Sequence, residues 1–225
     1  MLQLLERDLK DSGMETEPAK MMFSEIERIE RLLKQLLMHS HPMPIKSQSF
    51  NLHELLDTVL SFERSSHPGL RFTAYYDASL PDIEADRDKL HQVFLNLVRN
   101  ASEACPADGR VRVLTRHCAH WELAGTNLDP TRRYILVSIE DEGPGIPEEL
   151  RKNIFKPLFS TKKQGTGLGL SISFRLVESH GGQLRYQPSE RSGACFQVIL
   201  PESQSESLED NSPNFVYQDL RKEIS

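Results

Sequence analysis

Between residue 46 and Pro201 the sequence switches repeatedly between the two hydrophobic periods of regular secondary structure, and this switching limits the possible folds more than any other feature. Apolar residues recur at helical spacing in three segments, 52–62, 90–101 and 168–180. Four others are predicted to be strands, namely 70–76, 135–139, 183–187 and 195–200. Strands and helices in this order predict an α+β fold, a two-layer α/β sandwich with a mixed sheet and its helices on one face.

The longest predicted helix follows Asp86, whose side chain can cap its first turn. The helix after residue 168 should stop at Gly181-Gly182. In contrast, the segment from His117 to Thr131 has no clear period, so we expect a loop between strands there. The buried face of the longest helix is predicted to carry Leu90, Val93, Phe94, Leu97, Val98 and Ala101.

The first 45 residues predict a helical hairpin, which ends at His41-Pro42-Met43-Pro44. Its second helix carries a heptad seam that needs a partner, and a second copy of the hairpin in a four-helix bundle is the expected one. The alternative is a helix packed within a monomer. Beyond Pro201 the tail is rich in Ser, Asn and acidic residues, which predicts disorder over 203–225. We therefore expect three regions, 1–45, 46–202 and 203–225. The seam consists of Met22, Ile26, Ile29, Leu33 and Leu36.

The composition excludes several classes of protein. Lys and Arg number 27 against 33 Asp and Glu, a formal charge of -6, which argues against a nucleic-acid binder with a broad basic face. The apolar stretches are only a few residues long, so we expect no membrane span and no direct membrane contact in this chain. Cys105, Cys118 and Cys195 are too widely spaced for a zinc pair or a disulfide framework, which predicts a reducing, cytoplasmic location.

Four short segments carry residue types suited to nucleotide chemistry, and the first lies on the longest helix. Asn96, Asn100 and Glu103 fall on one narrow stripe of that helix, turned away from its apolar face. Carboxamide and carboxylate oxygens can hold a divalent cation, and Mg²⁺ needs few protein ligands because it keeps several waters. The alternative is an ordinary solvated polar stripe.

The second segment is Asp141-Glu142-Gly143-Pro144-Gly145-Ile146-Pro147, directly after an apolar strand. Two glycines allow a flat ring to lie against bare backbone while the carboxylate accepts a hydrogen bond from an exocyclic amine. Adenine carries that amine, whereas guanine has a carbonyl there and would leave the Asp unpaired at a cost of about 1–3 kcal/mol. The alternative is an ordinary Gly-Pro turn.

The third segment places Phe155 and Phe159 ahead of Lys162 and Lys163. The fourth, Gly165-Thr166-Gly167-Leu168-Gly169-Leu170, opens a helix. Its glycines let backbone N–H groups approach phosphate oxygens, and the helix N-terminus adds partial positive charge. It is neither a Walker loop nor a Rossmann fingerprint, because it lacks the Gly-Lys-Ser/Thr sequence of the first and the position and spacing of the second.

Taken in this order, the four segments resemble the N box, first glycine box, F box and second glycine box of sensor histidine kinases. Those kinases share a superfamily with gyrase, the heat-shock chaperone ATPases and the mismatch-repair ATPases. The run Phe159-Ser160-Thr161-Lys162, followed by Gly165 to Ile172, is most similar to the nitrogen-regulation type. The resemblance implies a Bergerat-type ATP-binding fold, ATP and Mg²⁺ as cofactors, and a dimerisation hairpin upstream.

The resemblance also implies roles for individual residues. Asn100 matches the magnesium ligand, Asn96 and Arg99 match neighbours of the phosphates, and Asp141 matches the adenine-binding Asp. Lys162 and Lys163 match lysines of a lid that can reach the terminal phosphate. With Asn96 and Arg99, they are the expected catalytic residues. The remaining ATP contacts that it implies are Gly143, Gly145, Ile146, Phe155, Phe159, Thr161, Gly165, Thr166, Gly167, Leu168, Gly169 and Leu170.

As an activity, the resemblance implies transfer of the γ-phosphoryl of Mg-ATP to a histidine, from which the receiver domain of a response regulator takes it. The acceptor box of this family is expected to be absent here. Only His53 is followed by Glu, and we interpret it as an exposed or core-edge histidine. The alternatives are an ATP-hydrolysing relative, an ATP-sensing interaction module, and a serine kinase of the same fold.

Overall fold

The computed structural model describes residues 44–162, 165–189 and 193–202. The predicted hairpin and its heptad seam, Lys163 and the 203–225 tail lie outside these residues. The described elements, in chain order, are β1 (Gln48–Phe50), α3 (Leu52–Ser66), β2 (Arg71–Tyr76), β3 (Ile83–Ala85), α4 (Arg87–Ala104), β4 (Arg110–His117), η1 (His120–Leu123), β5 (Tyr134–Asp141), α5 (Glu148–Arg151), α6 (Gly169–Ser179), β6 (Gln183–Pro188) and β7 (Ala194–Pro201).

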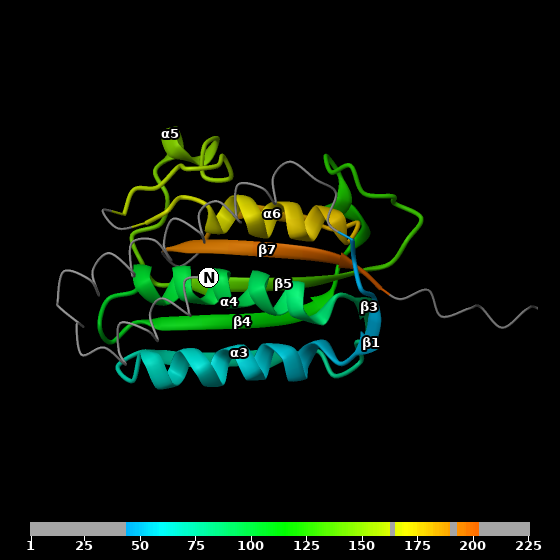
Figure 1. Cartoon of the computed structure of the whole chain (residues 1–225), viewed down its shortest axis with the longest axis horizontal. Coiled ribbons are helices and arrows are strands. Elements are labelled where there is room, and N and C mark those ends of the chain that lie inside the picture. Colours follow the sequence, from blue (N-terminus) through cyan, green and yellow to red (C-terminus); the bar gives the residue numbers. More distant parts are fainter. Residues whose placement is uncertain (1–43, 163–164, 190–192, 203–225) are drawn as a thin grey trace, which may run out of the picture.

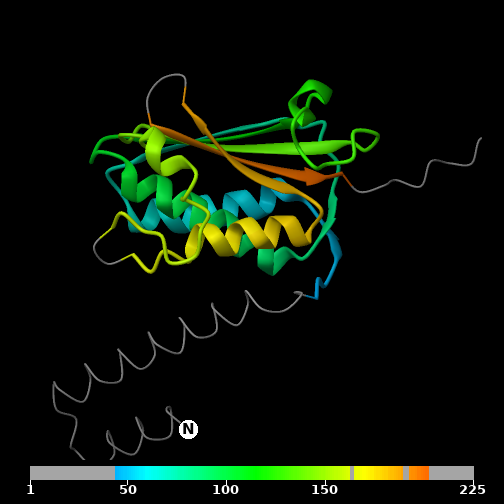
Figure 2. The ribbon, with the colours of Figure 1, turned by 90° about the horizontal axis from the view of Figure 1, so that it is seen from above.

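A five-stranded mixed sheet forms one layer, with strand order β2-β4-β5-β7-β6. Strands β2 and β4 run parallel, and the other neighbours are antiparallel. Strands β1 and β3 make a separate two-stranded pair. Helices α3, α4 and α6 lie together on one face of the large sheet (Figure 1, Figure 2). The predicted α+β sandwich is therefore confirmed for the described part of the chain.

The core lies between this helical layer and the sheet. The register brings apolar side chains of the central strands into line, because Val113 faces Ile139 and Ile139 faces Phe196 on the next strand. From the helical layer, Leu56 and Leu176 are completely buried against this surface. Each such side chain contributes about 1.5–3 kcal/mol through removal from water.

Helix α4 contributes more buried apolar residues to that core than α3 or α6 does, and it forms as the sequence predicts. The side chain of Asp86 accepts a hydrogen bond from the backbone N–H of Lys89 at 3.2 Å, which satisfies one free amide of the first turn. The helix ends where Cys105 precedes Pro106. The six residues predicted for its apolar face are all at most 1% exposed.

The opposite face of the sheet is partly covered by the 118–133 connection, which contains η1 (Figure 2). Leu123 packs there against Tyr134, Leu136 and Ile199 in a second small core. Glu122 anchors the connection, because its carboxylate accepts hydrogen bonds from Arg116 at 2.6 and 2.8 Å. The sequence predicted a loop but not this packing, and it did not predict strands β1, β3 and β4.

The described elements also bear on the expectations from composition. None of the helices in the described ranges is long and apolar enough to cross a membrane. All three cysteines are free thiols, as their spacing predicts. Burial raises the pKa of the Cys195 thiol to about 12, so this side chain stays protonated inside the sandwich.

Candidate functional site

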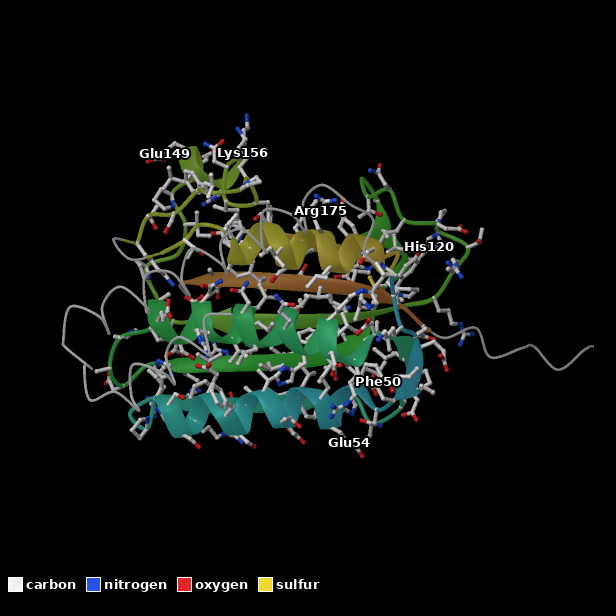
Figure 3. The ribbon with its side chains drawn as sticks, in the orientation of Figure 1. Phe50, Glu54, His120, Glu149, Lys156 and Arg175 are labelled. Carbon is white, nitrogen blue, oxygen red and sulfur yellow. The ribbon has the colours of Figure 1, made fainter. Side chains whose placement is uncertain are left out.

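The predicted site residues gather at one end of the sandwich. The C-terminal half of α4, the end of β5 and the beginning of α6 all lie at this end (Figure 1). The chain between β5 and α6 lies there as well, and Glu149 and Lys156 extend from it away from the sheet (Figure 3). The topology thus brings the four sequence segments, which span more than seventy residues of chain, to one place.

Asp141 is the last residue of β5 and is only 2% exposed. Its Oδ1 accepts hydrogen bonds from the backbone N–H groups of Gly143 at 2.9 Å and Ala194 at 3.1 Å. Burial raises the pKa of this carboxyl above its usual value, although the two N–H donors and the charge of Lys162 oppose the rise. Both backbone donors act on Oδ1, so Oδ2 is the oxygen that can accept a hydrogen bond from a ligand.

The backbone beside this carboxylate is glycine for a steric reason. A Cβ placed on Gly143 would lie 2.6 Å from the carbonyl oxygen of Ala104 and 2.9 Å from Asp141 Oδ1, closer than real Cβ atoms come. Two positions further on, Gly145 turns the chain, and Ile146 packs partly buried on the core. The wall beside the carboxylate is therefore bare backbone, which suits a flat ring.

The polar stripe of α4 faces other elements rather than open solvent alone. Asn96 Nδ2 donates to the Ser173 hydroxyl of α6 at 2.9 Å, so it links the two helices. One turn later, Asn100 Oδ1 accepts a hydrogen bond from the Lys162 ammonium at 3.4 Å. The same ammonium forms an ion pair with the Glu103 carboxylate.

Arg99 makes a different connection from the one that the resemblance implied. Its Nε lies 3.3 Å from Oε1 of Glu63, whose side chain is completely buried on α3. The other oxygen of Glu63 lies 3.2 Å from Nδ1 of His67. In this structure Arg99 therefore joins α4 to α3, and a role for it at the phosphates stays a prediction.

The aromatic residues of the third segment anchor it to the sandwich. The ring of Phe155 lies 5.2 Å from that of Phe174 on α6 and 6.5 Å from that of Phe196 on β7. Phe159 also packs partly buried against the core. Thr161 and Lys162 follow with exposed side chains, whereas the predicted Lys163 lies outside the described residues.

The fourth segment turns back into α6. Gly167 has φ +66°, and a Cβ on it would lie 2.4 Å from the carbonyl carbon of Leu158, so only glycine fits there. Gly165 and Thr166 are exposed, and the Thr166 hydroxyl accepts from the N–H of Leu168 at 3.4 Å. Leu168 is completely buried, so it holds the turn in the core. Helix α6 then begins at Gly169, and Leu170 is half-buried.

Three partners of these residues were not predicted. Ala194 positions the Asp141 carboxylate, Ser173 holds Asn96, and Glu63 pairs with Arg99. Each comes from an element distant in the sequence, and a single sequence contains no signal for such pairs. Only the position of Ala194 was partly predictable, because it lies at the start of a strand that the hydrophobic pattern predicted.

The residues present fit a magnesium nucleotide. The described ranges contain no group of three or more His, Cys, Asp or Glu that could hold a metal by itself. Mg²⁺ does not require one, since phosphate oxygens and waters complete its coordination around one or two protein oxygens. Asn100 Oδ1 is such an oxygen, and its contact with the Lys162 ammonium shows that a cation can reach it.

The fold and this arrangement define the class of protein, and the comparisons with known families agree. The model of the histidine kinase-, DNA gyrase B- and HSP90-like ATPase family matches residues 85–204, more than half of the chain. The matched range contains all four segments. This chain belongs to that family.

Individual relatives narrow the assignment further. The sensory histidine kinase/phosphatase NtrB of Azospirillum brasilense is 35% identical over 202 residues, which are 88% of this chain and 50% of that protein. The solved catalytic domain of the histidine kinase ThkA is 32% identical, with TM-score 0.60, and covers 70% of this chain and 96% of that domain. ThkA in complex with the response regulator TrrA is 29% identical, with TM-score 0.62, and covers 90% of this chain and 57% of that one.

The predicted resemblance to sensor histidine kinases of the nitrogen-regulation type is therefore confirmed. The chain spans about half the length of the NtrB protein it matches.

Proposed function

We propose that this chain is the kinase core of a two-component sensor histidine kinase. It would bind Mg-ATP and transfer the γ-phosphoryl group to a histidine on a dimerisation helix, and a response-regulator receiver domain would then take that group. The names of its relatives support this, as does the solved complex of ThkA with a response regulator. The observation that carries the proposal is the buried Asp141 carboxylate beside bare glycine backbone.

Adenine recognition follows from the geometry of that carboxylate. Two backbone N–H groups hold Oδ1, so Oδ2 can accept from the exocyclic amine of adenine. Guanine presents a carbonyl at the same place, and two acceptors facing each other leave a buried charge unpaired. We therefore propose preference for ATP over GTP by about 1–3 kcal/mol, the cost of an unsatisfied buried polar group.

At the phosphate end the residues are suited to transfer rather than to hydrolysis. The ATP-hydrolysing relatives carry a glutamate general base one helical turn before the metal-binding Asn, whereas this chain has Asn96 there. A carboxamide cannot take a proton from water, and this one donates to the Ser173 hydroxyl. When bound, Mg²⁺ would be held by Asn100 and would neutralise phosphate charge, while Lys162 supplies a further positive charge.

We further propose that the acceptor is not His53. Its Nε2 lies 2.9 Å from the Thr115 hydroxyl, and its ring stacks on Tyr76 at 4.5 Å between centroids. As expected, it is a half-buried histidine at the edge of the core. Homodimerisation through the 1–45 hairpin remains part of the proposal, as does a cytoplasmic location, which the three free thiols favour.

The test measures binding and transfer separately. Isothermal titration with Mg-ATP and Mg-GTP should give ATP binding that is about 5- to 150-fold tighter. Incubation with γ-labelled ATP and a separate dimerisation fragment that carries a His-Glu box should label the fragment on histidine, and the chain alone should stay unlabelled. Equal affinity for GTP would overturn the adenine assignment. ATP binding without any transfer would instead favour the nucleotide-sensing module.

A further inference from the structure

A lysine from the segment before the second glycine box lies on the polar stripe of α4. The Lys162 ammonium contacts two oxygen atoms one helical turn apart, Asn100 Oδ1 at 3.4 Å and a carboxylate oxygen of Glu103. About sixty residues separate the lysine from these partners in the sequence. Lys162 and Glu103 are 45% and 42% exposed, so the ion pair lies at the mouth of the site rather than in the core.

These contacts put a cation where the proposed function needs one. Asn100 Oδ1 is the oxygen that we assign to Mg²⁺, and the lysine ammonium donates a hydrogen bond to that same oxygen. The same positive charge acts on the Asp141 carboxylate, where it opposes the rise in pKa caused by burial. Lys162 is therefore electrostatically part of the nucleotide site and not only of the outer surface.

Two cations cannot share this oxygen at close range, because like charges a few ångströms apart repel strongly even near a protein surface. Mg²⁺ at Asn100 therefore requires that the lysine leave. Glu103 opposes that departure through its ion pair with Lys162.

We infer that Glu103 is a positioning residue that holds Lys162 on the metal-binding oxygen of Asn100 until Mg-nucleotide displaces it. Lys162 and Mg²⁺ then occupy this place in turn, and the displaced ammonium becomes available to phosphate oxygens. The inference rests on the proposed function, because it takes Asn100 as the metal ligand. Beyond the proposed function, the inference adds that Lys162 and Mg²⁺ exchange at Asn100 and that Glu103 controls this exchange.

The exchange predicts a coupling between two substitutions. In Glu103→Gln the ion pair no longer has to be broken, so Mg-ADP should bind about 1.5- to 5-fold tighter, which is the range set by exposed ion pairs. In a Lys162→Met background the same substitution should bring no such gain, because no ammonium remains to be held. ADP is the chosen ligand because it has no γ-phosphate for the lysine to contact.

The experiment is a double-mutant cycle measured by isothermal titration with Mg-ADP at low salt. It compares the wild type, Glu103→Gln, Lys162→Met and the double variant, and it adds Glu178→Gln on the exposed surface of α6 as the charge-matched control. A gain in affinity for Mg-ADP that appears only when Lys162 is present supports the inference. Equal gains in both backgrounds would mean that Glu103 merely repels phosphate. A loss of affinity for Mg-ADP in Glu103→Gln would indicate that Glu103 is a metal ligand. Equal gains in both backgrounds, or such a loss, would overturn the inference.

A second measurement needs neither metal nor nucleotide. Acylation of the Lys162 amine, followed by mass spectrometry, should be faster in Glu103→Gln than in the wild type and unchanged in Glu178→Gln. Unchanged labelling in Glu103→Gln would contradict the ion pair itself. If the wild type fails to bind Mg-ADP, the proposed function fails. If it binds Mg-ADP but the cycle shows no coupling, only the cation exchange fails.

Discussion

The substitution Asp141→Asn separates what this residue does for binding from what it costs the fold. The two side chains have the same shape, and Oδ1 of an asparagine can accept both hydrogen bonds that Gly143 and Ala194 now donate to Asp141. The amide nitrogen then takes the place of Oδ2 and turns a donor toward the adenine amine. Loss of this hydrogen bond should weaken Mg-ATP binding by about 1–3 kcal/mol, or about 5- to 150-fold.

The effect of the same substitution on stability has the opposite sign. Burial raises the pKa of Asp141, so the folded chain keeps this proton to a higher pH than the unfolded chain does. Between the ordinary Asp pKa and the raised value, ionisation therefore lowers the free energy of unfolding, and the penalty is complete above the raised value. Asparagine has no charge to bury. The variant should therefore have a higher Tm than the wild type at pH 7.

Thermal unfolding from pH 3 to pH 8, together with titration calorimetry at pH 7, tests both halves of this reasoning. The difference in Tm should shrink toward the acid end, where the carboxyl is protonated in the folded and unfolded states alike. Asp108→Asn, an exposed aspartate in the turn before β4, is the matched control and should change neither quantity. If Asp141→Asn binds Mg-ATP as tightly as the wild type does, the proposed hydrogen bond to adenine is refuted. If it is less stable than the wild type at pH 7, the proposed cost of burying the charge is refuted.

Three further predictions concern other parts of the structure. Asn100→Ala should remove most of the Mg²⁺ dependence of ATP binding with an unchanged circular dichroism spectrum, and unchanged metal dependence would mean that the ligand is misassigned. Phe94→Ala, which empties a completely buried position, should lower the free energy of unfolding in urea by about 3–5 kcal/mol. The control Phe62→Ala, at a residue 53% exposed, should stay within about 0.5 kcal/mol. Glu122→Gln should cost about 1–2 kcal/mol by weakening the bonds to Arg116, without loss of nucleotide affinity. Hydrogen bonding from Arg116 lowers the pKa of Glu122, so this contribution is complete above the ordinary Glu pKa and is lost as pH falls through the lowered value. The deficit of the variant should therefore shrink in acid.

The sequence by itself determined the features that depend on near neighbours along the chain. The apolar face of α4 and its Asp86 cap could be predicted because helix periodicity and capping involve residues at most a few positions apart. The same holds for the strand that ends at Asp141. The glycines that follow it could be recognised in the sequence, but the backbone that excludes a side chain there belongs to Ala104 and Gly193, which are distant in the chain. The order of the four segments was also enough to predict the family.

Only the tertiary structure decided which residues meet across the molecule. Ala194 donates to Asp141 because β7 pairs with β5, and Arg99 joins Glu63 because α4 packs beside α3. Lys162 reaches Asn100 and Glu103 from the chain between β5 and α6. The 118–133 connection has no period, yet Leu123 is buried on the sheet, because a loop needs only one well-placed apolar side chain to dock. Contacts of this kind depend on long-range geometry, and no local pattern of residue types specifies that geometry.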